Sequence, residues 1–204
     1  MKRIMLVLAL FVTGNALANG QVFYRLGSAN IQMNRDGQIF TDVGGANGLN
    51  SDDKGMSIGA GLDMKLFDCL VYDKGEVFGE IFVNYTKFSE ERVASAASVL
   101  ASSDSSKKEV NVSELNVTIA PKYKVNWGRF KPWIIPIGLS FLVNSPPSDT
   151  TNYLDIGYHA AIGAEFEVFD RLSLGVDFRY TKGSGDPSYA FESLDAGAYM
   201  GLNF

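Results

Sequence analysis

Hydrophobic and polar side chains alternate along eight separate stretches of this chain. In the last stretch, every second position from Leu194 onward is apolar, and the chain ends on the aromatic Phe204. A β-strand points successive side chains to opposite sides, so this alternation predicts a strand with one apolar face and one polar or small face. The same argument predicts strands over residues 21–29, 56–66, 76–87, 110–125, 130–143, 153–168, 172–180 and 193–204.

The connections between these strands alternate in length. The long ones are polar and fall at 30–55, 88–109, 144–152 and 181–191, whereas short turns join the other pairs of strands. Long external loops, short periplasmic turns and an even number of strands are typical of barrels that cross an outer membrane. We therefore predict an all-β fold, an eight-stranded antiparallel up-and-down transmembrane β-barrel.

A soluble eight-stranded calyx also has alternating strands, but its apolar face would line a ligand cavity. Two features favour the membrane barrel instead. The polar face combines isolated charges with many of the 21 glycines, as a narrow interior requires. The apolar face carries large side chains on nearly every strand, as a lipid-facing surface requires.

The stretch 130–143 is the least regular of the eight. Unbroken alternation would place Trp133 and Ile135 outside the barrel, with Ile134 and Pro136 inside. A proline has no N–H group to donate to a strand ladder, so irregular pairing is expected here and near Pro121.

The N-terminus resembles an export signal. Residues 1–3 are basic after the initiator methionine, residues 4–12 are apolar, and Ala16-Leu17-Ala18 forms a small-x-small cleavage site. We expect a signal peptide over 1–18 and a single barrel domain over 19–204, located in the bacterial outer membrane. The formal net charge of −5 argues against nucleic acid as a partner, and the single cysteine, Cys69, excludes an internal disulfide.

Charged residues recur at the positions predicted to face inward. Because an unpaired buried charge is costly, we expect a network of ion pairs, with Arg179 facing Asp195 or Glu165. A polar conduction path remains an alternative interpretation of the same residues. The inward charges are Arg25, Asp63, Lys65, Glu80, Glu114, Lys122, Lys124, Asp155, Glu165, Glu167, Asp177, Arg179 and Asp195.

Segments 156–165 and 172–180, together with the terminal Phe204, resemble the outer-membrane β-barrel family of OmpA/OmpX type, which includes small opacity and porin-like barrels. Segment 20–29 is also similar to the start of OmpW-type barrels. The resemblance implies an envelope protein with a structural or adhesive role at the cell surface. The chain end looks like the signal read by the outer-membrane assembly machinery, with the residues Tyr199, Met200, Leu202 and Phe204.

Three functions follow as hypotheses. The first is a structural or surface-interaction role without enzymatic activity, cofactor or metal, and with outer-membrane lipids, lipopolysaccharide, the assembly machinery and an extracellular ligand of the loops as partners. The second is a narrow channel or lateral route for small apolar molecules, suggested by Pro132, Ile134 and Pro136. The third is a lipid-modifying enzyme. His159 is the sole histidine, but Ala161 stands where a His-x-Ser motif of lipid A deacylases would need serine.

Overall fold

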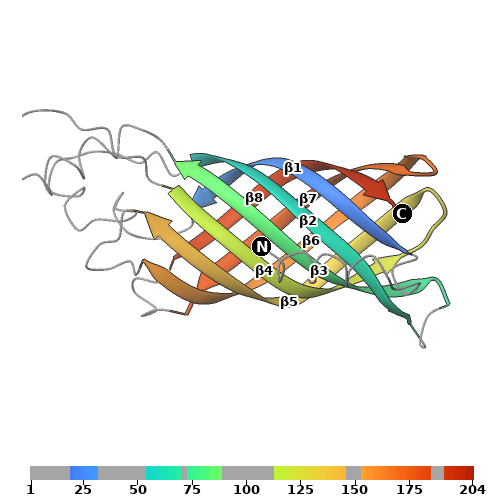
Figure 1. The fold of residues 1–204 in the computed structure, drawn as a ribbon, viewed down its shortest axis with the longest axis horizontal. Coiled ribbons are helices and arrows are strands. Elements are labelled where there is room, and N and C mark those ends of the chain that lie inside the picture. The colour runs from blue at the N-terminus through green and yellow to red at the C-terminus, as the bar shows by residue number, and fades with distance from the viewer. Residues whose placement is uncertain (1–18, 32–53, 70–72, 89–112, 146–152, 185–190) are drawn as a thin grey trace, which may run out of the picture.

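Eight strands close into one barrel in the computed structural model (Figure 1). The structure describes residues 19–31, 54–69, 73–88, 113–145, 153–184 and 191–204. The strands are β1 (Gly20–Ile31), β2 (Lys54–Asp68), β3 (Gly75–Phe88), β4 (Ser113–Val125), β5 (Phe130–Ser145), β6 (Leu154–Phe169), β7 (Leu172–Gly183) and β8 (Glu192–Asn203). The predicted fold class is confirmed. The predicted start of the fourth strand at 110–112 and most of the predicted loops lie outside the described residues.

Each strand pairs antiparallel with its neighbour in sequence, and β8 closes the barrel against β1. We call the end where β1 begins and β8 finishes the turn end, because the short connections β2–β3, β4–β5 and β6–β7 lie there; in Figure 1 it carries the label C. The opposite end is the loop end. None of the described residues forms a helix long and apolar enough to cross a membrane.

The two faces of the strands differ in the way the alternation predicts. Large apolar side chains such as Leu26, Ile58 and Val176 are exposed on the outside of the barrel, whereas charged side chains such as Arg25 and Asp63 are buried inside it. This arrangement is the reverse of a soluble calyx, so the calyx alternative is wrong. We refer to the space enclosed by the strands as the lumen.

Strand β5 departs from the predicted pattern. Trp133 and Ile135 are buried in the lumen, whereas Ile134 and Pro136 face outward. The pairing of β5 with β6 shifts in register between Ile135 and Gly138. This irregularity begins at Pro136, which cannot donate to the ladder, and it reverses the facing of the residues before it. The predicted outward Trp133 and Ile135, and the predicted inward Ile134 and Pro136, are therefore wrong.

The pairing of β4 with β5 shifts as well, between Ile119 and Tyr123, next to Pro121. The inward Trp133 is accommodated because Gly163 lies opposite it on β6 and has no side chain to compete for the space. Gly61 faces the Phe23 ring in the same way. Glycine on the inner face thus makes room for aromatic rings that extend into the lumen.

Candidate functional site

A continuous chain of ion pairs runs through the lumen, and we call it the ion chain. Its first part is centred on two arginines. Arg25 Nε donates to Asp177 Oδ1 at 2.7 Å, and its Nη1 donates to Asp195 Oδ2 at 2.9 Å. Arg179 Nε donates to the other oxygen of Asp177 at 2.9 Å, and its Nη1 donates to Glu80 Oε1 at 2.6 Å. Asp177 therefore bridges the two guanidinium groups.

The second part of the ion chain is centred on two lysines. Lys122 Nζ donates to Glu80 Oε2 at 3.0 Å and to Asp63 Oδ2 at 2.8 Å. Lys124 Nζ lies 3.0 Å from Glu165 Oε1 and 3.8 Å from Asp63 Oδ2. Glu80 thereby links the two parts of the ion chain, because it accepts hydrogen bonds from both Arg179 and Lys122.

These contacts decide how the inward charges are organised. Arg179 lies directly opposite Asp195 in the β7–β8 ladder, as predicted, but its ion pairs are with Glu80 and Asp177 instead. Arg25 takes Asp195. Positive and negative side chains alternate along the whole ion chain, and they are almost fully buried. Each charge is therefore stabilised by an opposite charge in place of water.

Aromatic rings fill the lumen beside the ion chain. The Phe23 ring stacks on Phe82 at a centroid distance of 5.7 Å and contacts Tyr199 at 5.5 Å. Trp133 Nε1 donates to the Tyr199 hydroxyl at 2.7 Å. Lys122 Nζ lies 4.1 Å from the Trp133 ring centroid, within the range of a cation–π contact. Rings and ions together close the middle of the barrel.

Sequence reasoning missed Trp133 as a member of this cluster, because its position depends on the irregularity in β5. Arg179 also stacks its guanidinium over Phe82, 4.0 Å from the ring centroid. Only the run of inward glycines signals such a cluster in the sequence, since large rings in a narrow barrel need small residues opposite them.

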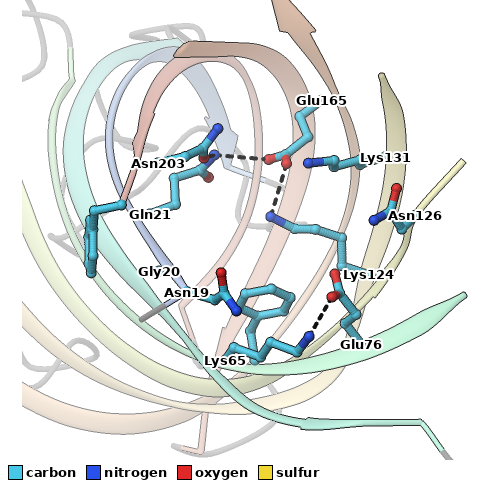
Figure 2. Close-up of a pocket in the computed structure, with 12 residues that line it drawn as sticks. Asn19, Gly20, Gln21, Lys65, Glu76, Lys124, Asn126, Lys131, Glu165 and Asn203 are labelled. Atoms are coloured by element: carbon cyan, nitrogen blue, oxygen red, sulfur yellow. Dashed lines mark hydrogen bonds and ion pairs between the residues drawn. The ribbon is translucent and has the colours of Figure 1, made fainter. Parts of the chain in front are cut away.

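A polar pocket of about 210 Å³ opens at the turn end (Figure 2). Lys65 pairs there with Glu76 at 2.6 Å and with Asp68 at 2.7 Å. Lys124 and Glu165, the last ion pair of the ion chain, also line this pocket. Lys65, one of the predicted lumen charges, thus lies at the mouth of the barrel and is separate from the ion chain.

A second, much smaller cavity of about 10 Å³ lies toward the loop end, and we call it the loop-end chamber. Glu114 lines it and forms no ion pair with any described residue, although it is only 3% exposed. Asn84 and His159 line it as well. In the part of the chain that the structure describes, no three His, Cys, Asp or Glu side chains are grouped as a metal site.

The remaining predicted residues lie toward the two ends. Glu167 pairs with Lys131 at 2.7 Å near the turn end, and Asp155 accepts from the Ser184 hydroxyl at 3.4 Å near the loop end. Of the predicted assembly signal, Tyr199 is buried in the lumen. The other three signal residues point outward and are exposed: Met200, Leu202 and Phe204.

Comparison with known proteins identifies the fold. No family model and no curated protein sequence matches this chain. Among solved structures, Neisserial surface protein A aligns with a TM-score of 0.56 at 15% identity, covering 91% of this chain and 97% of that one. The outer-membrane enzyme PagL aligns with a TM-score of 0.50 at 15% identity, covering 89% and 98%. Ail, the attachment invasion locus protein of Yersinia pestis, aligns with a TM-score of 0.50 at 8% identity, covering 92% and 99%.

These three structures share an architecture but differ in the activity that their names describe. At such low identity the likeness shows the fold alone. The chain therefore has the fold of the small eight-stranded outer-membrane barrels, a class that contains a surface protein, an attachment protein and an enzyme.

Proposed function

We propose that this protein is an integral outer-membrane barrel with a closed lumen, which supports the envelope and makes contacts outside the cell through the segments at its loop end. The observation that carries the proposal is the ion chain, whose members are almost fully buried and paired with opposite charges. The turn end would then lie in the periplasm, as is usual for short connections in such barrels.

The closed lumen supports this role over that of a channel. A conducting path needs water from one mouth to the other, but buried ion pairs and stacked rings lie between the turn-end pocket and the loop-end chamber. Eight strands enclose a space that side chains can fill. The route for small apolar molecules also loses its support from the sequence. It was suggested by an inward Ile134 and Pro136, but both side chains face the outside of the barrel.

The position of His159 supports a role without lipid chemistry. Its side chain is 1% exposed and points into the lumen, where its Nδ1 lies 3.1 Å from the Thr181 hydroxyl. A lipid substrate would contact the outer face of the barrel, so its acyl bonds could not reach this imidazole. Deleting or overexpressing the protein should therefore leave lipid A unchanged, which mass spectrometry of extracted lipid A would test.

The experiment that tests closure is conductance in planar lipid bilayers. Purified, folded protein should give no regular single-channel steps, while an open porin prepared in the same detergent serves as the positive control. Before each recording, an unboiled sample should migrate faster than a boiled one on a gel, which shows that the barrel is folded. Regular steps from folded protein would contradict the proposal.

The surface role needs a separate experiment on cells. Each of the segments 32–53, 89–112, 146–152 and 185–190 would be replaced in turn by a short Gly-Ser connection, and attachment to host cells or matrix proteins would be measured. At least one replacement should abolish attachment while the folded gel form persists. If the strain lacking the protein attaches normally and resists detergents like the wild type, the proposal is wrong.

A further inference from the structure

We propose that the loop-end chamber binds one divalent metal cation through Glu114 Oε2, Asn84 Oδ1 and His159 Nε2. Each of these atoms is buried and without a hydrogen-bond partner among the described residues. The three side chains come from β4, β3 and β6 and line the same cavity. Three buried atoms without a hydrogen-bond partner among the described residues thus belong to the lining of one cavity, which points to a common ligand.

The orientation of Asn84 is set by its neighbours. Its Nδ2 donates to Asp195 Oδ2 at 3.2 Å and to the Thr86 hydroxyl at 3.3 Å. An ionised carboxylate can only accept, so the amide nitrogen must point toward Asp195. Asn84 Oδ1 is therefore left as an acceptor in the chamber. Asn84 Oδ1 and Glu114 Oε2 are thus two oxygen atoms in the chamber that could coordinate a cation.

His159 is held so that one ring nitrogen stays available. Its Nδ1 lies 3.1 Å from the Thr181 hydroxyl, which also accepts from Asn116 Nδ2 at 3.3 Å. With the proton on Nδ1, the ring donates to Thr181 and leaves the lone pair of Nε2 for a ligand. A hydrogen bond on the far nitrogen is the usual way in which a metal-binding histidine is oriented.

The balance of charge favours a divalent ion. Among the described residues, the buried carboxylates exceed the buried bases by two. Arg179 also lines the chamber, but its ion pairs are with Glu80 and Asp177. The carboxylates are Asp63, Glu80, Glu114, Glu165, Asp177 and Asp195, and the bases are Arg25, Lys122, Lys124 and Arg179.

The size and chemistry of the chamber narrow the choice of ion. A volume of about 10 Å³ suits one body of the size of a water molecule. A water could satisfy the three atoms, but it would leave the excess negative charge in place. A set of one carboxylate oxygen, one amide oxygen and one imidazole nitrogen suits ions such as Zn²⁺ or Mn²⁺ better than Ca²⁺, which prefers six or more oxygen ligands.

The test uses the full-length barrel, purified without chelator and analysed for metals by mass spectrometry. We expect one equivalent of a divalent metal per chain. After treatment with EDTA, Zn²⁺, Mn²⁺, Mg²⁺ and Ca²⁺ chlorides would be added singly while binding and the unfolding temperature are measured. One of the first two should bind and raise the unfolding temperature, and Glu114→Gln should weaken its binding by at least about tenfold.

Two further variants make the result specific. His159→Gln should weaken binding as well, whereas Glu76→Gln, the same change as Glu114→Gln but at the turn end, should bind like the wild type. Equal binding by wild type and Glu114→Gln would place the metal elsewhere and overturn the proposal. The absence of metal binding by the folded wild-type barrel would also overturn the proposal. An infrared band of a protonated carboxyl group that Glu114→Gln removes would then show that a proton neutralises Glu114.

Discussion

Every buried charge in the middle of the lumen has a partner of opposite sign, whereas Glu114 in the loop-end chamber has none among the described residues. Glu114 is as deeply buried as the members of the ion chain, and Arg179 and Asp195 of the ion chain also line the chamber. The difference shows that burial alone does not set the character of an inward charge in this barrel. What matters is whether the facing strands supply a counter-charge.

The two regions should therefore respond differently to substitution. In the ion chain, removal of one member leaves its partners uncompensated in a medium of low dielectric constant. In the metal-free chamber, removal of the Glu114 charge leaves no opposite charge of a described residue uncompensated. The substitutions below use this contrast, and each is measured as the free energy of unfolding in urea from lipid vesicles unless another measurement is given.

The largest effect is expected from Arg179→Met, which removes the positive charge between Glu80 and Asp177. Two buried carboxylates then lose a partner, and unfolding should become easier by about 3–5 kcal/mol. Lys131→Met is the matched control, because Lys131 pairs with Glu167 at the partly exposed mouth. It should cost less than about 1 kcal/mol. Equal losses would show that the ion chain is no more important than a surface pair.

The second prediction compares one substitution in the two regions, in metal-depleted buffer. Glu80→Gln keeps the size of the side chain but removes a charge that accepts from Arg179 and Lys122, and it should destabilise the barrel by about 1.5–3 kcal/mol. Glu114→Gln removes an uncompensated charge and should cause no loss or a small gain in stability. A loss for Glu114→Gln as large as that for Glu80→Gln would mean that Glu114 has a partner of its own.

The third prediction concerns the rings that lie beside the ion chain. A methyl group on Gly61 would collide with the Phe23 ring, which is held between Phe82 and Tyr199. Gly61→Ala should therefore destabilise the barrel by about 1–3 kcal/mol through overpacking. In Gly79→Ala the added carbon would have Leu66 as its nearest neighbour, at 3.7 Å, which is an ordinary contact. That control should be neutral, and a neutral Gly61→Ala would show that the rings can move aside.

Much of this architecture follows from the alternation of residues, because a strand in a barrel has only two faces and they meet opposite environments. The facing of β8 could be predicted from Leu194 to Phe204 alone. The partners in the ion chain could not. Arg179 stands opposite Asp195 in the ladder, yet its side chain extends to Glu80 on β3, a strand that does not neighbour β7. Such contacts depend on how the closed barrel brings distant strands together.

The prediction of which β5 side chains point into the lumen was wrong for a different reason. Pro121 and Pro136 show in the sequence that the pairing of β4 and β5 must be irregular, but not where the extra residue falls. Since the side-chain period of a strand is two, a shift of one residue exchanges the inside and the outside. The error thus concerned a single position, and it moved Trp133 from the predicted lipid face into the lumen.

The fourth prediction tests this assignment by fluorescence, and its readout does not depend on the stability that is lost with the Trp133–Tyr199 hydrogen bond. Trp127 and Trp133 are the two tryptophans of the chain. Trp127→Phe leaves Trp133 as the only tryptophan, which is the emitter when the excitation is selective for tryptophan over the nine tyrosines. Adding Trp133→Phe and Ile134→Trp moves this emitter by one residue to the outward face at nearly the same depth. In vesicles of brominated lipid, the emitter at position 134 should be quenched more strongly than the one at 133, because bromine atoms reach only the outer face. Stronger quenching at 133 would show that the alternation in β5 is unbroken and that Trp133 faces the lipid. The contact of Lys122 with the Trp133 ring at 4.1 Å would then be wrong.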